Sequence, residues 1–270
     1  MQLNSAIKRG SDNECLSVVM PAFNEENTIA TIIERVSRIP NLREIVVVDD
    51  CSTDRTYSII SEIAKKDARV VCLKLPRNMG KTEALKIGFA ATEGDIVVVQ
   101  DADLEYDPSE LSMVIQPILD GHADVVYGSR FLVHKTARVL YFYHYVANKC
   151  LTFACNLFTN MNMSDVETCY KAFRGDIIRN MIITSSGFGF EIEVTAKVAK
   201  LKCRVYEVPI SYYGRTYEEG KKIGWRDGVA ALWYIVWFSV FRSLQDSFRT
   251  IPTKASVEPA RELEVAGTHR

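Results

Sequence analysis

Three carboxylates stand within five residues at the start of the segment Asp101–Pro108 (DADLEYDP), directly after the apolar run Asp95–Gln100 (DIVVVQ). Alternate residues of an extended segment point the same way, so Asp101 and Asp103 can share one cation. Carboxylate oxygens of this kind suit Mg²⁺ or Mn²⁺ rather than zinc, and hard cations held by one or two carboxylates commonly also bind substrate phosphates. The pattern therefore predicts a site that neutralises a diphosphate.

The acidic segment also has less specific interpretations. An Asp-x-Asp pair is common by chance, and Glu105 is either a third metal ligand or an exposed residue. Asp107 is expected to cap the helix that Pro108 opens. A second acidic set, Asp49 and Asp50, ends another apolar run. In an open parallel sheet, ligands bind beyond the carboxyl ends of the strands, so both acidic sets are expected to face one crevice.

The elements that must position these residues are short, continuous, β-branched runs, as expected for strands covered on both faces. Apolar residues at helical spacing lie between them, at Ile29–Val36 and Leu111–Ile118. Alternating strands and helices predict an α/β fold with a mostly parallel, twisted sheet and helices on both faces. The predicted strands are Leu16–Met20, Ile45–Asp49, Arg69–Leu73, Asp95–Gln100 and Asp124–Gly128.

The second half of the chain is less regular. Cys203–Tyr213 reads as an extended segment near a sheet edge, with a proline inside it, and Gly214–Gly228 as a charged, glycine-rich loop. An amphipathic helix is expected to follow. We divide the chain into a flexible N-terminus (1–15), one main domain (16–228), a C-terminal amphipathic helix (229–249) and a disordered tail (250–270).

Composition limits the function. With 33 Lys and Arg against 34 Asp and Glu, the net charge is -1, so no basic field points to nucleic acid. Seven cysteines without a Cys-x-x-Cys pair indicate neither a disulfide framework nor a zinc site, and fit a reduced, cytoplasmic setting. The N-terminus has no apolar signal core, and no stretch reaches the roughly 20 apolar residues of a spanning helix.

Four blocks resemble the signature blocks of family 2 glycosyltransferases, in that family's order and spacing across residues 16–130. The blocks are SVVMPAFNEENTI (17–29), IVVVDDCSTDRT (45–56), NMGKTEALKIGF (78–89) and DADLEYDP (101–108). The resemblance implies a GT-A fold, a nucleoside diphosphate sugar (NDP-sugar) donor, Mg²⁺ or Mn²⁺ as cofactor and inversion at the anomeric carbon.

The resemblance also implies roles for single residues on the donor side. Phe23 stands where the family often has Tyr, and Lys81 has a simpler interpretation as a solvated residue at a helix start. The metal ligands would be Asp101 and Asp103, with Glu105 as the open third choice. The implied donor contacts are Pro21, Phe23 and Glu25 in the nucleoside pocket, Val48 and Asp50 at the base and ribose, Gly80 and Lys81 in a nearby loop, and Asp101, Ala102 and Asp103 in the metal motif.

On the acceptor side the chain resembles the branch of dolichol-phosphate mannose synthases. Arg130 in YGSRF matches a phosphate-contacting arginine of that branch. NMSDVETCYKAFR (162–174) resembles its acceptor block, with Cys169 in place of the usual glycine. RTYEEGKKIG (215–224) resembles its mobile loop, in which Arg215 and either Lys221 or Lys222 would close over the phosphates.

The acceptor decides the chemistry. A lipid phosphate is already an anion and needs no general base, only positioning and charge neutralisation. A sugar hydroxyl needs a carboxylate base, and Asp165 or Glu167 either fills that role or hydrogen-bonds the local backbone. We expect a hexosyltransferase that uses a UDP- or GDP-sugar and a polyprenyl or dolichyl phosphate. The alternatives are a glycosyltransferase acting on a hydroxyl of a surface polysaccharide, and a non-catalytic sugar-nucleotide-binding protein.

Aromatic residues are concentrated in Val139–Phe158 and in LWYIVWF (232–238). Tyrosine and tryptophan favour the headgroup zone of a bilayer, so both stretches fit interfacial helices. We therefore expect a cytoplasmic protein bound peripherally to the inner face of the membrane. The alternative is packing in the core or at a homo-oligomer interface, and a separate membrane partner is compatible with either.

Overall fold

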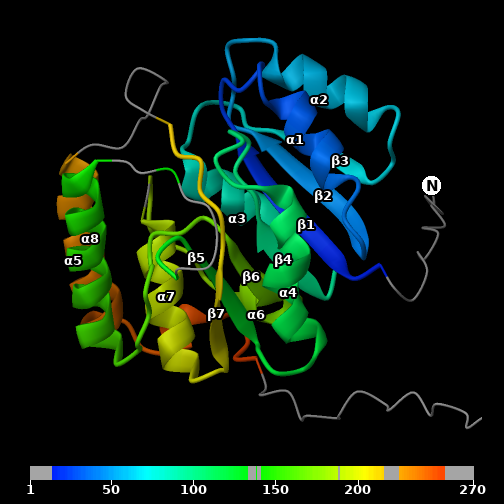
Figure 1. The fold of residues 1–270 in the computed structure, drawn as a ribbon. Coiled ribbons are helices and arrows are strands. Elements are labelled where there is room, and N and C mark those ends of the chain that lie inside the picture. Colours follow the sequence, from blue (N-terminus) through cyan, green and yellow to red (C-terminus); the bar gives the residue numbers. More distant parts are fainter. Residues whose placement is uncertain (1–13, 133–137, 139–140, 188, 216–224, 253–270) are drawn as a thin grey trace, which may run out of the picture.

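A seven-stranded sheet forms the centre of the molecule (Figure 1). The structure is a computed structural model that describes residues 14–132, 138, 141–187, 189–215 and 225–252. The spatial order of the strands is β3-β2-β1-β4-β6-β5-β7. Their bounds are β1 Leu16–Ala22, β2 Leu42–Asp49, β3 Val70–Lys74, β4 Ile96–Val99, β5 Val125–Ser129, β6 Lys171–Arg174 and β7 Val205–Pro209. The five predicted strands and the extended segment at the sheet edge are thereby confirmed.

Only β6 among these strands runs against its neighbours. It pairs antiparallel with β4 and with β5, whereas the remaining pairs are parallel. The sequence did not predict β6, because this four-residue strand begins with Lys171 and ends with Arg174 and so lacks an apolar run. Its partners on both sides stabilise it, which is a tertiary effect that local pattern does not report.

The strand order creates a switch point beside the acidic segment. The chain passes from β1 to β2 and β3 at one edge, and then returns to place β4 on the other side of β1. Loops diverge where the order reverses, which leaves a crevice beyond the carboxyl ends of the strands. Asp50 follows β2 and Asp101 follows β4, so both acidic sets belong to this edge.

Helices cover both faces of the sheet (Figure 1). Ile45 and Val47 of β2 join the core that contains α1, whereas Val46 and Val48 pack with Ala84 of α3 in a separate cluster. Successive residues of β2 thus pack against helices on opposite faces of the sheet. The α-helices are α1 Ile29–Val36, α2 Thr56–Ala64, α3 Lys81–Ala91, α4 Leu111–Leu119, α5 Phe142–Thr159, α6 Gly175–Asn180, α7 Phe190–Leu201 and α8 Trp225–Val236.

The C-terminal helix differs in its bounds from the prediction. It begins at Trp225, inside the segment predicted as a loop, and its α-helical part ends at Val236. A π-helical turn, η2 (Trp237–Phe241), and a short 3₁₀ turn, η3 (Gln245–Ser247), follow, besides η1 (Pro108–Glu110) before α4. The glycine and charged residues near Trp225 suggested a loop, but packing of α8 on α5 and α7 stabilises a helix there.

Helices α5 and α8 lie side by side at one end of the molecule (Figure 1). Within the described part of the chain, no helix combines the length and the apolar character needed to cross a membrane. Residues 1–13 and 253–270, which make up most of the predicted N-terminal segment and tail, lie outside the described residues.

Candidate active site

The acidic segment is held at the carboxyl end of β4 by a lysine. Lys81 Nζ lies 3.0 Å from Asp101 Oδ1 and 3.2 Å from Glu191 Oε1. Burial disfavours the charge of Lys81, but the two carboxylates outweigh it and hold its pKa well above the ordinary value. The interpretation of Lys81 as a solvated residue is therefore wrong: the lysine starts α3 and bridges β4 to α7.

Arg215 occupies the centre of the acidic segment. Its Nη2 lies 2.8 Å from Asp103 Oδ2 and 3.4 Å from Glu25 Oε1, and its backbone N donates to Glu105 Oε1 at 2.8 Å. Glu105 Oε2 also accepts a hydrogen bond from Tyr212 at 2.9 Å. Three predicted site residues, Asp103, Glu25 and Arg215, are thus brought together, and Glu105 is neither exposed nor free to turn toward a ligand.

A divalent cation fits the charge of this cluster. Burial first, and then the negative charges of Asp101 and Glu105, raise the pKa of Asp103 to about 7. A guanidinium lies where these oxygens gather, so the site accepts a positive charge. Across the described residues no three carboxylate, imidazole or thiol groups form a ready metal cage. Asp101 and Asp103 would hold a metal ion, whereas Glu105 is engaged by Arg215 and Tyr212.

Asp50 shapes the loop before α3. Its two carboxylate oxygens accept from the backbone N–H groups of Met79 and Gly80, at 2.7 and 2.8 Å. Gly80 has φ +89°, a conformation that favours glycine. The prediction that Asp50 meets the ribose is not tested by these contacts. Val48 is fully buried against α3, and the prediction that it meets a base stays untested.

Arg130 and Asp165 form a buried, two-pronged ion pair. Arg130 Nε and Nη2 donate to Asp165 Oδ2 and Oδ1, both at 2.7 Å, and the Asp165 side chain is fully buried. Both oxygens of this buried carboxylate are held by a guanidinium, which favours a positioning role, and the role of Asp165 as a base stays a prediction. In this arrangement Asp165 orients Arg130, whose guanidinium carbon also lies 5.1 Å from the Tyr212 ring centroid.

The cysteine in the acceptor block does not disturb the backbone. Cys169 is buried, is absent from the residues with positive φ, and its backbone N donates to the hydroxyl of Tyr106 at 3.2 Å. No left-handed conformation is therefore required at the position where the family has glycine. Lys221 and Lys222 lie outside the described residues.

The remaining predicted donor contacts lie at the same edge of the sheet. Pro21 is half-buried at the end of β1, Phe23 is half-buried just beyond it, and Ala102 is buried between Asp101 and Asp103. Sequence reasoning did not find Glu191 and Tyr212, which join the site from distant segments. The run of acidic residues at the start of α7 carried no spacing signal that links it to Lys81.

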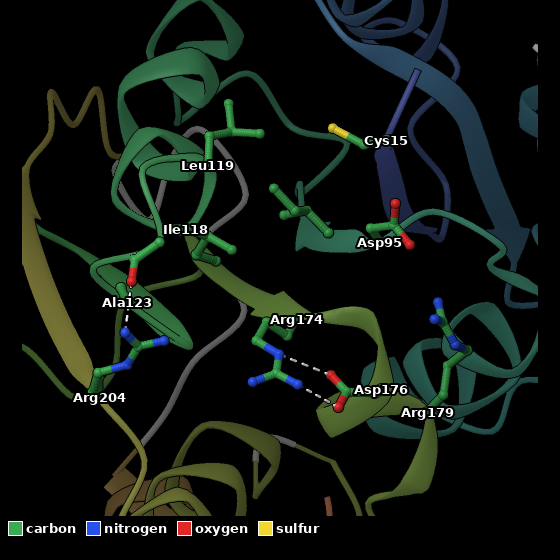
Figure 2. Close-up of a pocket in the computed structure, with 11 residues that line it drawn as sticks. Cys15, Asp95, Ile118, Leu119, Ala123, Arg174, Asp176, Arg179 and Arg204 are labelled. Atoms are coloured by element: carbon green, nitrogen blue, oxygen red, sulfur yellow. Dashed lines mark hydrogen bonds and ion pairs between the residues drawn. The ribbon is translucent and has the colours of Figure 1, made fainter. Parts of the chain in front are cut away.

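A pocket lies away from the acidic cluster, at the other edge of the sheet. This pocket has a volume of about 490 Å³, and its lining includes Cys15 and Asp95, which precede β1 and β4 (Figure 2). It therefore opens at the amino ends of the strands, opposite the acidic cluster. Arg174 pairs there with Asp176 at 2.7 Å, and also with Asp124, so the positive charges of this pocket are largely compensated.

The family profile described as "Glycosyl transferase family 2" matches residues 17–182, and the chain belongs to this family. The Low-salt glycan biosynthesis hexosyltransferase Agl6 of Haloferax volcanii is 34% identical over 78% of this chain and 51% of its own length. An undecaprenyl-phosphate 4-deoxy-4-formamido-L-arabinose transferase of Edwardsiella ictaluri is 29% identical over 76% and 62%. A dodecaprenyl-phosphate galacturonate synthase of Rhizobium johnstonii is 25% identical over 76% and 61%. The chain thus spans about half to three-fifths of the length of these relatives.

The fold is similar to that of glucosyl-3-phosphoglycerate synthase from Mycobacterium tuberculosis, solved in complex with uridine diphosphate. The TM-score is 0.66, with 21% identity, over 84% of this chain and 80% of that chain. Further structures of that protein hold Mn²⁺ or Mg²⁺ together with uridine diphosphate. This likeness confirms the predicted GT-A fold of the sheet and its helices, while the interfacial role of the C-terminal helices stays a prediction.

Proposed function

We propose that this protein moves a hexose from a UDP- or GDP-sugar to a polyprenyl phosphate, with inversion at the anomeric carbon. The observation that carries the proposal is the meeting of two opposite charge sets at one edge of the sheet. Asp101 and Asp103 follow β4, Arg215 pairs with Asp103, and Arg130 lies over the ring of Tyr212, whose hydroxyl donates to Glu105. The names of the relatives from Edwardsiella ictaluri and Rhizobium johnstonii point to polyprenyl phosphates as acceptors.

The acidic side is assigned to the donor. When bound, a divalent cation would offset the charge of the departing nucleoside diphosphate. Asp101 and Asp103 are the residues that would hold it, with Arg215 released from them to contact the phosphates. Pro21, Phe23 and Glu25 remain the proposed nucleoside contacts, and the loop that Asp50 fixes at Gly80 approaches the donor.

The basic side is assigned to the acceptor. A phosphate oxygen of the lipid forms a new bond to the anomeric carbon as the bond from that carbon to the diphosphate breaks, and the diphosphate leaves as an anion. Arg130 is pre-oriented by Asp165, which leaves its Nη1 to contact the incoming phosphate. No proton has to be removed, so this reaction needs no base at the position of Asp165.

A donor panel tests the proposal. The protein is incubated with Mn²⁺ or Mg²⁺, undecaprenyl phosphate and one UDP- or GDP-hexose at a time, and the glycolipid is detected by mass. One donor should give a product whose mass equals that of the lipid phosphate plus a hexose less one water, since a hexosyl group replaces a proton. Nucleotide release without glycolipid would indicate that the acceptor is a saccharide hydroxyl. No nucleotide release and no product with any donor would favour a protein that only binds the sugar nucleotide.

The membrane side of the proposal rests on the outer surface of α5 and α8. Both helices carry exposed aromatic residues, including Phe153 and Trp233, and they pack against each other. A polyprenyl phosphate presents its phosphate at the bilayer surface, so an enzyme acting on it has to reach that surface. We propose that these exposed aromatic side chains of α5 and α8 lie in the headgroup zone of the membrane, on the cytoplasmic side.

A further inference from the structure

Helix α5 combines an exposed apolar side with a polar side that faces the rest of the protein. The exposed apolar residues recur at helical spacing and include Val146, Phe153 and Leu157. A second row, also at helical spacing, is buried or half-buried and consists of Lys149, Thr152 and Asn156. We call these three residues the polar row. Contact with a membrane does not require them, so their partners indicate what else the helix does.

Asn156 binds the main chain of Met163 at two points. Its Nδ2 donates to the carbonyl O of Met163 at 2.8 Å, and its Oδ1 accepts from the backbone N of the same residue at 3.0 Å. One side-chain amide thus satisfies both main-chain groups of a residue that is only 6% exposed. Removal of this amide would leave two polar groups unpaired in a place that little water reaches.

The next residues of the acceptor block are held by the same side of α5. Lys149 Nζ donates to the carbonyl O of Ser164 at 3.0 Å, and Thr152 Oγ1 accepts from the backbone N of Val166 at 3.3 Å. The hydroxyl of Thr152 donates in turn to Asn148 Oδ1 at 3.4 Å, which leaves a lone pair for that backbone N. About two turns of one helix therefore hold the main chain of this short segment.

The segment that the polar row holds carries Asp165, whose carboxylate binds Arg130 through two hydrogen bonds of 2.7 Å. On its other side the segment is bound to β7, where Glu207 accepts from the backbone N and the hydroxyl of Ser164 at 2.9 and 3.0 Å. Asp165 thus lies between two fixed supports, and the place of the Arg130 guanidinium depends on both. A displacement of about 1 Å in a binding group is enough to cost up to about 100-fold in rate.

We propose that Lys149, Thr152 and Asn156 are positioning residues for the acceptor phosphate, which act on it through Asp165 and Arg130. The inference rests on the proposed function, because it takes Arg130 to bind the phosphate of a lipid acceptor. It gives α5 two tasks, since its exposed side chains meet the membrane and its polar row fixes the phosphate-binding arginine to the same helix. The arginine is thereby held at a fixed place relative to the surface at which the lipid phosphate lies.

Thr152→Val and Thr152→Ser form the matched pair that tests the proposal. Valine has nearly the shape of threonine but leaves the backbone N–H of Val166 without its acceptor, whereas serine keeps the hydroxyl. Thr152→Val and Asn156→Ala are each expected to raise the KM for undecaprenyl phosphate and the Kd for farnesyl phosphate about tenfold, because Arg130 is displaced. Thr152→Ser should stay within about twofold of the wild type.

The donor side supplies the first control, because Asp101, Asp103 and Arg215 belong to other segments. The KM for the NDP-hexose should therefore change by less than about twofold in each variant. Calorimetry gives the Kd for farnesyl phosphate without turnover, and steady-state glycolipid formation gives both KM values. An unchanged Kd and acceptor KM in both Thr152→Val and Asn156→Ala would overturn the proposal.

Thr159→Val controls for a general loss of helix stability. Thr159 donates to the carbonyl O of Cys155, within α5, at 2.7 Å, and lies outside the polar row. This change should lower the melting temperature without changing KM or Kd. Asn156→Ala should bind vesicles as the wild type does, because the exposed side of α5 is unchanged. A loss of vesicle binding that accounts for the whole rise in KM would mean that the helix acts only through the membrane, against the proposal.

A double-variant cycle determines whether the polar row acts through the arginine. In Arg130→Ala, which has lost the proposed phosphate contact, the further change Asn156→Ala should have little additional effect on the Kd for farnesyl phosphate. Effects that multiply in the double variant would show that Asn156 does not act through Arg130, and would refute its positioning role.

Failure of the proposed function gives a different pattern from failure of this inference. A wild type that binds no farnesyl phosphate and forms no glycolipid would remove the acceptor on which both depend. A wild type that does both, and is matched by Thr152→Val and Asn156→Ala, would leave the proposed function intact and refute the inference alone.

Discussion

The charges of the site compensate each other in this structure. Lys81 neutralises Asp101, and Arg215 neutralises Asp103 while also binding Glu25 and Glu105. Clustered carboxylates would repel one another without these partners, because little solvent reaches them. In the proposed reaction, the same positive side chains would bind the phosphates of the donor once a metal ion takes over the carboxylates. Metal binding and the position of Arg215 should therefore depend on each other.

At Asp103, replacement by alanine is expected to abolish transfer and leave the fold intact. The side chain is a proposed metal ligand that contributes no core packing, and burial followed by the charges of Asp101 and Glu105 raises its pKa. Steady-state glycolipid formation measures the first effect and circular dichroism the second. Asp107→Ala is the matched control, because Asp107 caps the following turn through the backbone N of Ser109 at 3.0 Å. It should cost about 1 kcal/mol of stability and retain activity. Normal turnover in Asp103→Ala would refute the site.

At Arg215, replacement by alanine is expected to act in opposite directions on metal binding and on transfer. Without the guanidinium, Asp103 loses the partner at 2.8 Å that competes with a metal ion, so Mn²⁺ should bind more tightly in the absence of donor. Transfer should fall by about 100-fold, because the proposed contact of Arg215 with the donor phosphates is lost. Electron paramagnetic resonance of free Mn²⁺ gives the affinity. Equal Mn²⁺ affinity in the two proteins would mean that Arg215 and the metal occupy different places.

The elements of the sheet show where sequence reasoning succeeds. The parallel strands are continuous β-branched runs, a signal strong enough to predict β1 to β5, and the acidic residues follow from their place after β2 and β4. Strand β6 was missed because its stability comes from its neighbours. The contact of Arg215 with Glu105 joins segments 110 residues apart, and no local pattern reports it. For the same reason the sequence left the role of Asp165 open, since only the folded structure shows that Arg130 binds its carboxylate.

Asp124 connects three strands at the opposite edge of the sheet, and its charge should make stability depend on pH. It precedes β5 and accepts hydrogen bonds from Arg174 at the end of β6 and from Arg204 just before β7. Burial alone would raise the pKa of Asp124, but these hydrogen bonds lower it to about 2. A depressed pKa stabilises the fold above the unfolded value near 4, and this contribution is lost as the pH falls toward 2.

Wild-type protein should therefore lose about 1–2 kcal/mol of unfolding free energy from this carboxylate between pH 4 and pH 2, after allowance for solvent screening. Asp124→Asn should be less stable by about 2 kcal/mol at pH 7, because two guanidinium groups lose their anionic partner. Its stability should also change less over that acidic range. Urea unfolding at pH 7, 4 and 2.5 measures both quantities. An identical acid dependence in the two proteins would show that Asp124 does not titrate as described.

The whole molecule has two unlike ends. The charged site lies at the carboxyl edge of the sheet, while α5, α8 and η2 lie together at one end of the molecule (Figure 1). That end is rich in exposed apolar side chains. We call this end the aromatic face, and its exposed residues include Phe142, Tyr143, Phe153, Leu157, Trp233 and Phe241. Contiguous apolar surface of this kind marks an interaction site rather than ordinary surface. The proposed lipid acceptor would place the membrane there, and a homo-oligomer is the competing occupant.

Phe153→Ser and Trp233→Ser distinguish these occupants, because the two side chains are 71% and 60% exposed and contribute little to the fold. If the face enters the headgroup zone, each change should weaken binding to vesicles of phosphatidylglycerol and phosphatidylcholine by about tenfold, since each removes an apolar group worth about 1.5 kcal/mol or more on burial. Vesicle sedimentation measures the effect. Tyr206→Ser on β7, at an exposed position outside the aromatic face, is the control and should bind vesicles normally. If both changes instead leave vesicle binding intact and reduce the sedimenting mass of the free protein, the aromatic face joins copies of this chain, and the membrane assignment is wrong.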